Sequence, residues 1–181
     1  MPIAKGLGGG YIPLGAAVYS RKIGDVLHAR FGGPQTGHTF TGHTTACAAG
    51  VAVQKIIRRD RLIERVAEKG PLLIEYIRQA LQGVEAVGDV RGRGYFIGVE
   101  LVADRISKVP FSPSDQLFLR VRQRAFQNGL ICYPSGGNVD GVAGDTIIVS
   151  PRYNASDAEL AEIAEKLGKS MREALLEIGA G

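Results

Sequence analysis

The chain has 181 residues, of which 45% are hydrophobic, so it is long and apolar enough to form a folded core. Its 22 Lys and Arg against 18 Asp and Glu give a net charge of +4, and its few aromatic residues do not alternate with basic ones, which argues against a nucleic-acid-binding protein. The longest apolar run is too short to span a bilayer and the N-terminus lacks the order of a signal peptide, so we expect no membrane partner.

The first 60 residues contain turns, glycine and one strong helix signal. Small and apolar residues run from about Thr44 to Ile57, just after Gly42, and they occupy every side of the predicted helix. That pattern indicates a helix buried all round. Residues 1–43 hold too few apolar side chains for a core of their own. A second helix follows from about Asp60, and Pro71 either kinks or splits it.

From Val84 onward, strand and helix signals alternate. Apolar residues at every second position predict a strand over 95–101. A helix is expected from Pro113, capped by Ser112 and ended by Asn128-Gly129. Short strands are expected at 130–133 and 146–149, on either side of a glycine-rich loop. A capping box at Ser156–Glu159 begins the last helix. Residues 84–181 are thus predicted to form an α/β or α+β unit with its own core.

The cysteines and histidines do not form a metal site. Cys47 and Cys132 are 85 positions apart, without the spacing of a zinc site or a disulfide framework. His38 and His43 are five positions apart with no third ligand nearby. We therefore expect no metal, and a reducing, cytoplasmic location.

Lys5 stands beside a run of glycines in the opening KGLGGGYIPLGAA. A nucleotide-binding P-loop needs its lysine after the glycines, followed by Ser or Thr, and a dinucleotide-binding fingerprint needs a glycine where Tyr11 stands. Both nucleotide sites are excluded. From spacing alone, the favoured interpretation of Lys5 is a solvated side chain on a flexible segment.

Four motifs, taken together, change that interpretation. KGLGGGYIPLGAAV, GHTFTGHTTACAAGVAV, VRGRGYFIGVELV and GDTIIVSPRYNASDAEL follow one another in an order and spacing that resemble the C-terminal part of class III aminotransferases, which are fold type I enzymes that use pyridoxal 5'-phosphate. The resemblance implies an α/β fold: a fragment of the transferase large domain over residues 1–57, a connecting helical segment over 58–83, and the C-terminal small domain over 84–181.

The resemblance also implies the site residues. Lys5 matches the lysine that joins the cofactor aldehyde as a Schiff base and later carries a proton between substrate and cofactor. Burial readily lowers the pKa of a lysine, which suits it to this task. Thr39 matches a residue that binds the cofactor phosphate of the neighbouring subunit, and Phe40 beside it is assigned to the same cofactor site. A homodimer with a shared active site follows from that match.

The implied reaction moves an amino group from an amine or ω-amino acid to a keto acid such as pyruvate. An aminomutase, a decarboxylating relative and a folded remnant without catalysis stay open as alternatives. The family's acidic partner of the pyridine nitrogen, its ring-stacking aromatic residue and its first phosphate loop lie before the lysine, where this sequence has only Met1–Ala4. We therefore expect little activity from the chain alone. Arg152, in SPRYNAS where relatives have SPPYNAT, has no assigned role.

Overall fold

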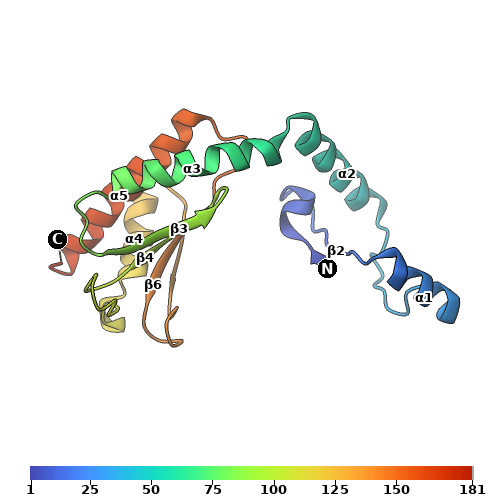
Figure 1. Cartoon of the computed structure of the whole chain (residues 1–181), viewed down its shortest axis with the longest axis horizontal. Coiled ribbons are helices and arrows are strands. Elements are labelled where there is room, and N and C mark those ends of the chain that lie inside the picture. Colours follow the sequence, from blue (N-terminus) through green and yellow to red (C-terminus); the bar gives the residue numbers. More distant parts are fainter. Residues whose placement is uncertain (181) are drawn as a thin grey trace. The chain divides into compact units, whose positions relative to one another are not determined.

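The computed structural model describes residues 1–180 and divides into two compact units, Met1–Arg61 and the residues from Leu62 onward (Figure 1). The first unit contains a two-stranded antiparallel ribbon, a 3-10 helix and two α-helices. In chain order these elements are β1 (Pro2–Ile3), η1 (Lys5–Gly8), β2 (Ala16–Ala17), α1 (Arg21–Phe31) and α2 (Thr44–Arg59).

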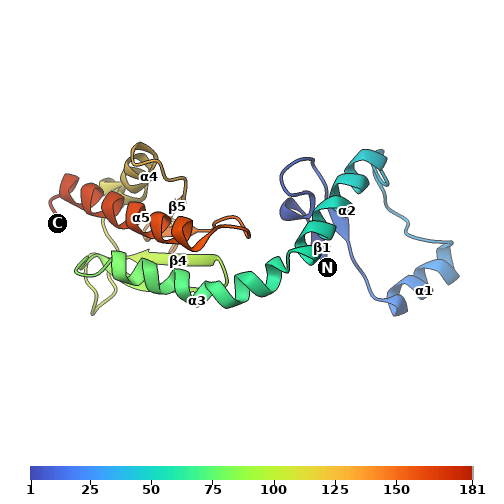
Figure 2. The ribbon, with the colours of Figure 1, turned by 90° about the horizontal axis from the view of Figure 1, so that it is seen from above.

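The second unit is a four-stranded antiparallel sheet with three α-helices (Figure 2). The strand order is β3-β4-β6-β5. Helix α5 packs against both α3 and α4, and these two helices contact the strands. The elements are α3 (Leu62–Ala80), β3 (Val87–Arg93), β4 (Phe96–Leu101), η2 (Pro113–Asp115), α4 (Leu117–Gln127), β5 (Tyr133–Gly136), β6 (Asp145–Val149) and α5 (Asp157–Glu177).

The hydrophobic core belongs entirely to the second unit. Its central residues are fully buried and come from α3, the two middle strands and all the later helices: Leu73, Ile77, Ile97, Val99, Leu117, Val121, Ile147, Leu160 and Leu167. In the first unit only Gly8, Ala46 and Gly50 are buried. The second unit therefore has the packed interior that stabilises a fold, and the first has almost none.

Helix α2 confirms the predicted helix and corrects its predicted surroundings. The helix covers Thr44–Arg59, but the expectation that it is buried on every side is wrong within this chain, since Val51 is 54% exposed and Ile56 is 44% exposed. Residues 1–61 supply neighbours for one side of the helix only. Its other apolar side chains remain in contact with solvent.

The later elements match the prediction in kind and differ at two boundaries. Strand β4 buries Ile97, Val99 and Leu101 at every second position, as expected, and α5 begins with the predicted capping box. The helix expected from Pro113 is instead a short 3-10 turn followed by α4, because Gln116 between them adopts a left-handed φ of 48°. Strand β5 covers Tyr133–Gly136, whereas the sequence predicted a strand over residues 130–133.

Within residues 1–180, none of the helices is both long and apolar enough to cross a membrane.

A buried carboxyl group lies at the start of β6. Asp145 is 7% exposed, and its Oδ1 accepts a hydrogen bond of 3.2 Å from the backbone N–H of Phe118. Burial raises the pKa of Asp145, and the nearby Asp115 carboxylate adds to the effect. The folded state therefore favours the protonated acid: its contribution to stability is present in acid and is lost as the pH rises through the folded-state pKa.

We expect Asp145→Asn to stabilise the second unit at neutral pH, because the amide keeps an acceptor for Phe118 and carries no charge. Urea denaturation across a pH series measures this. The stability advantage of the variant should shrink as the pH falls and Asp145 of the wild type becomes protonated. An advantage that does not change with pH would mean that charge burial is not its cause.

Candidate active site

Lys5 lies at the start of a tight glycine-rich turn. It is the first residue of η1, one residue after the end of β1, and its φ of 53° lies in the left-handed region, which is uncommon for a residue with a Cβ. The turn is closed by hydrogen bonds of 3.1 Å from Leu7 to Ala4 and from Gly9 to Gly6. Within residues 1–180 the ammonium group of Lys5 is exposed and has no hydrogen-bond or ion-pair partner. The lysine is therefore presented by an ordered turn.

Two glycines allow this turn to pack on α2. A Cβ added to Gly50 would lie 2.6 Å from Leu14 Cδ2, and one added to Gly9 would lie 3.0 Å from Val53 Cγ2. The N-terminal turn η1 also contacts α2. The close approach of backbone and helix holds the lysine turn on the middle of α2.

Thr39 and Phe40 occupy a second turn that leads into α2. The backbone N–H of His38 donates to Thr41 Oγ1 at 2.9 Å, and the N–H of Thr41 donates to the His38 carbonyl at 2.8 Å. His43 caps the helix, with its Nδ1 accepting from the Ala46 N–H at 3.3 Å. Phe40 is 76% exposed. The helix N-terminus beside this turn has the positive end of the helix dipole and suits an anion.

The predicted site residues thus share one supporting helix and lie at different places along it. The turn that begins at Lys5 packs on α2 through Leu7 and Gly9, whereas Thr39 and Phe40 precede the first turn of that helix. No hydrogen bond joins Lys5 to either of them in the part of the chain that the structure describes. Within residues 1–180, the structure does not bring the three residues together in one pocket.

The charge of this unit fits an anionic ligand. Eight of the chain's 22 basic side chains but only two of its 18 acidic side chains lie in residues 1–61, so the unit carries a net charge of +6. The two acids are Asp25, exposed on α1, and Asp60, which pairs with Arg59 at 2.7 Å. A primary amine, a hydroxyl and a helix N-terminus fit an aldehyde and a phosphate. Within residues 1–180, neither acid forms a hydrogen bond or ion pair with Lys5.

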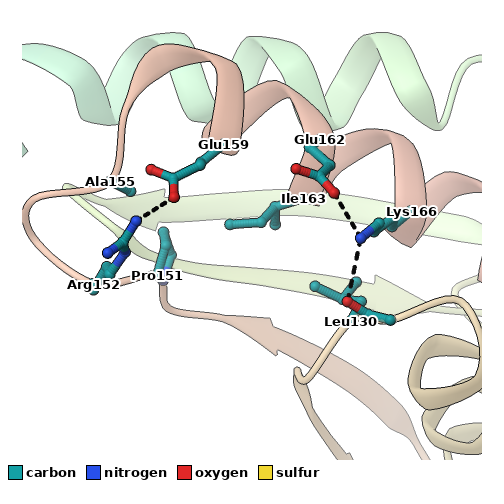
Figure 3. A pocket seen from close by; sticks show the side chains of 9 residues that line it. Leu130, Pro151, Arg152, Ala155, Glu159, Glu162, Ile163 and Lys166 are labelled. Carbon is teal, nitrogen blue, oxygen red and sulfur yellow. Dashed lines mark hydrogen bonds and ion pairs between the residues drawn. The ribbon is translucent and has the colours of Figure 1, made fainter.

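The sequence assigned no role to Arg152, but in the structure this residue forms an ion pair with Glu159. It lines a shallow cleft in the second unit and pairs with Glu159, whose other oxygen accepts from the Ser156 N–H at 2.7 Å (Figure 3). Lys166, on the same cleft, pairs with Glu162 at 2.7 Å. The Arg152–Glu159 pair joins the loop after β6 to the first turn of α5, so Arg152 supports the start of that helix.

Hydrogen bonds from Ser156, with the Arg152 charge, lower the pKa of Glu159. The stability from this cap is present above the ordinary glutamate pKa and is lost as the pH falls through the lowered one. We expect Ser156→Ala to reduce the free energy of unfolding by about 1 kcal/mol. Urea denaturation at neutral and acid pH measures this, and a cost as large in acid as at neutral pH would contradict the role of Glu159.

Comparison with known proteins supplies the context for this geometry. The sequence model of the family described as "Aminotransferase class-III" matches residues 1–171. An aminotransferase from Gibberella zeae is 39% identical over 174 residues, which are 96% of this chain and 34% of the relative.

Solved structures agree in fold. A transaminase from the marine bacterium Virgibacillus superposes with a TM-score of 0.90 at 29% identity, over 99% of this chain and 40% of that one. A thermostable (S)-enantioselective omega-transaminase from Thermomicrobium roseum gives a TM-score of 0.85 at 29% identity, over 96% and 37%. These matches confirm the predicted fold class. The chain spans only about a third of the length of the curated relatives it matches.

Proposed function

Because this chain belongs to the class III aminotransferases, we propose that it contributes the cofactor-attaching lysine of a pyridoxal-phosphate-dependent transaminase. One observation supports the proposal: the amine of Lys5, which the sequence resemblance matches to the family's lysine, has no partner within residues 1–180 and belongs to a turn that packs on α2. A lysine that only provided solubility would not need an ordered left-handed turn packed on a helix.

Pyridoxal phosphate, when bound, supplies an aldehyde for amines and an electron sink for the substrate carbon. Lys5 would hold that group through Nζ, yield its place to the donor amine, and then move a proton at its freed Nζ. The proton transfer requires a neutral amine. Since Lys5 is exposed within residues 1–180, we assign the burial that favours its neutral form to parts of the aminotransferase fold outside these residues.

We assign Thr39 and Phe40 to the cofactor site of a neighbouring subunit in a homodimer. The support is their separation along α2 from Lys5 of the same chain, together with the hydroxyl and helix N-terminus that suit a phosphate. In this arrangement, Thr39 of one subunit binds the phosphate of the cofactor held by the partner subunit's lysine, which does not itself reach that phosphate. The active site is then complete only in the dimer.

For the substrates, we propose an amine or ω-amino acid as donor and a keto acid such as pyruvate as acceptor. The omega-transaminase among the similar structures supports this choice. We also propose a cytoplasmic location, in keeping with two cysteines that are both free thiols.

The proposed function is tested by mixing the full chain with the part of the Gibberella zeae aminotransferase that it does not match. We expect pyruvate to be converted to alanine when an ω-amine and pyridoxal phosphate are supplied, with little conversion by either polypeptide alone. Release of carbon dioxide or an isomerised amine would favour the decarboxylase or aminomutase instead. A well-formed complex without any turnover would favour a remnant without catalysis.

A further inference from the structure

The C-terminal end of α4 is joined to α5 through the side chain of one asparagine. Helix α4 packs against α5 (Figure 2), and Asn128 is the residue that ends α4. Its Nδ2 donates to Ser170 Oγ at 3.0 Å and to Glu173 Oε2 at 2.8 Å, so both amide hydrogens are used. Ser170 is fully buried, and its hydroxyl donates in turn to the Lys166 carbonyl at 2.6 Å. The amide of Asn128 is therefore part of the packing between the two helices.

Asn128 is followed by Gly129, and in this pair the backbone can react with the side chain. When the Gly129 nitrogen attacks Asn128 Cγ, the N–Cγ bond forms, the Cγ–Nδ2 bond breaks, and ammonia leaves with the proton of the Gly129 N–H. Water then opens the five-membered succinimide ring at either carbonyl, which yields aspartate or isoaspartate. A glycine favours the attack because it has no Cβ beside the nitrogen. Asn138 and Asn154, the other asparagines of the chain, are each followed by a residue with a Cβ.

We propose that Asn128 is a deamidation site, that its contacts with α5 keep it unreacted in the folded chain, and that its conversion uncouples the end of α4 from α5. In the folded state the attacking group is occupied, because the Gly129 N–H donates to the Phe126 carbonyl at 3.0 Å. The leaving group is occupied as well, because Nδ2 is held by Ser170 and Glu173. The reaction needs both groups free at the same time, so it proceeds when the end of α4 opens.

Conversion places a carboxylate where the folded chain needs an amide. The new group would lie beside Glu173 Oε2, to which it has no hydrogen to donate, and the two like charges repel each other. Two ammonium groups lie nearby and are already engaged: Lys166 pairs with Glu162 at 2.7 Å, and Lys169 approaches the other oxygen of Glu173 at 3.9 Å. The contact between Asn128 and α5 is therefore lost in the product.

The test incubates the full chain in mildly alkaline buffer, with and without urea, and follows each asparagine by mass spectrometry. One tryptic peptide carries both Asn128 and Asn138, so its fragment ions compare the two residues directly. We expect Asn128 to be converted first in urea, and to react about tenfold or more slowly in the folded chain. Equal rates of Asn128 conversion in the two states, or faster conversion of Asn138 or Asn154 in urea, would overturn the proposal.

A pair of variants tests the contact with α5. Glu173→Ala removes one acceptor of the Asn128 amide, and we expect it to speed conversion in the folded chain about tenfold, because a hydrogen bond to a charged group is lost. The matched control is Glu165→Ala, which removes an exposed carboxylate from the same helix and should react like the wild type. Equal acceleration by the two changes would mean that the charge of α5, and not this contact, protects Asn128.

The effect of the product is measured with Asn128→Asp. We expect this change to lower the urea concentration at which the second unit is half unfolded. Adding Glu173→Gln should recover most of the loss, since the introduced amide can donate to the introduced carboxylate. A midpoint that Asn128→Asp leaves unchanged, or that the second change does not restore, would contradict the uncoupling of α4 from α5.

Discussion

Lys5→Ala is expected to lower alanine formation by the reconstituted enzyme by about 10³-fold or more, because it removes the only amine on the ordered turn beside α2. The loss should fall on turnover, since substrate contacts made elsewhere are unchanged. Steady-state rates of the wild type and the variant, measured with the same partner polypeptide, give the ratio directly.

The matched control is Lys22→Ala. Lys22 is exposed on α1 in the same unit, so this change removes one positive charge without touching the turn at Lys5. We expect activity close to the wild type. Equal losses in the two variants would mean that general charge, rather than the position of one amine, is what the reaction needs.

Leu167→Ala is expected to reduce the free energy of unfolding of the second unit by about 2–5 kcal/mol. Leu167 is fully buried on α5, inside the core formed with α3 and the sheet, so truncation removes apolar contacts and leaves a cavity. Urea denaturation followed by far-ultraviolet circular dichroism measures the change.

Leu176→Ala, on the same helix, provides the comparison. Leu176 is 69% exposed, and we expect its truncation to change stability by about 0.5 kcal/mol or less. If the two variants lost the same stability, helix propensity rather than core packing would be responsible, and the core described for the second unit would be wrong.

The sequence predicted the elements whose signals are local. The Ser156–Glu159 capping box and the alternation that buries Ile97, Val99 and Leu101 depend on residues a few positions apart, and the structure confirms them. The position of β5 depends on pairing with β6, in which Tyr133 faces Ile148. No local pattern contains that register, so the predicted strand was misplaced.

Close packing between segments that lie far apart in the sequence could not be predicted from local patterns either. A Cβ at Gly70 on α3 would lie 2.7 Å from Gly94 Cα, in the turn between β3 and β4. Arg65 donates to the Ala155 carbonyl at 2.6 Å, 90 positions away in the sequence. These contacts require the folded arrangement of the second unit, which residue spacing does not encode.

The candidate site, too, could be predicted only where its signals were local in the sequence. The lysine and the glycines of its turn were visible in the sequence, and their importance came from a resemblance spread over four motifs. The apolar composition of α2 predicted a helix buried on every side, but residues 1–61 cover one side only.

The proposed role of Lys5 is to hold the cofactor through its amine. The most direct measurement incubates the full chain, with the unmatched part of the fungal relative, in pyridoxal phosphate, reduces the mixture with borohydride and maps the labelled peptides by mass spectrometry. The chain has seven lysines, which compete for the label. Label concentrated on Lys5 is the predicted result; label spread evenly over the seven, or absent from Lys5, would contradict the claim.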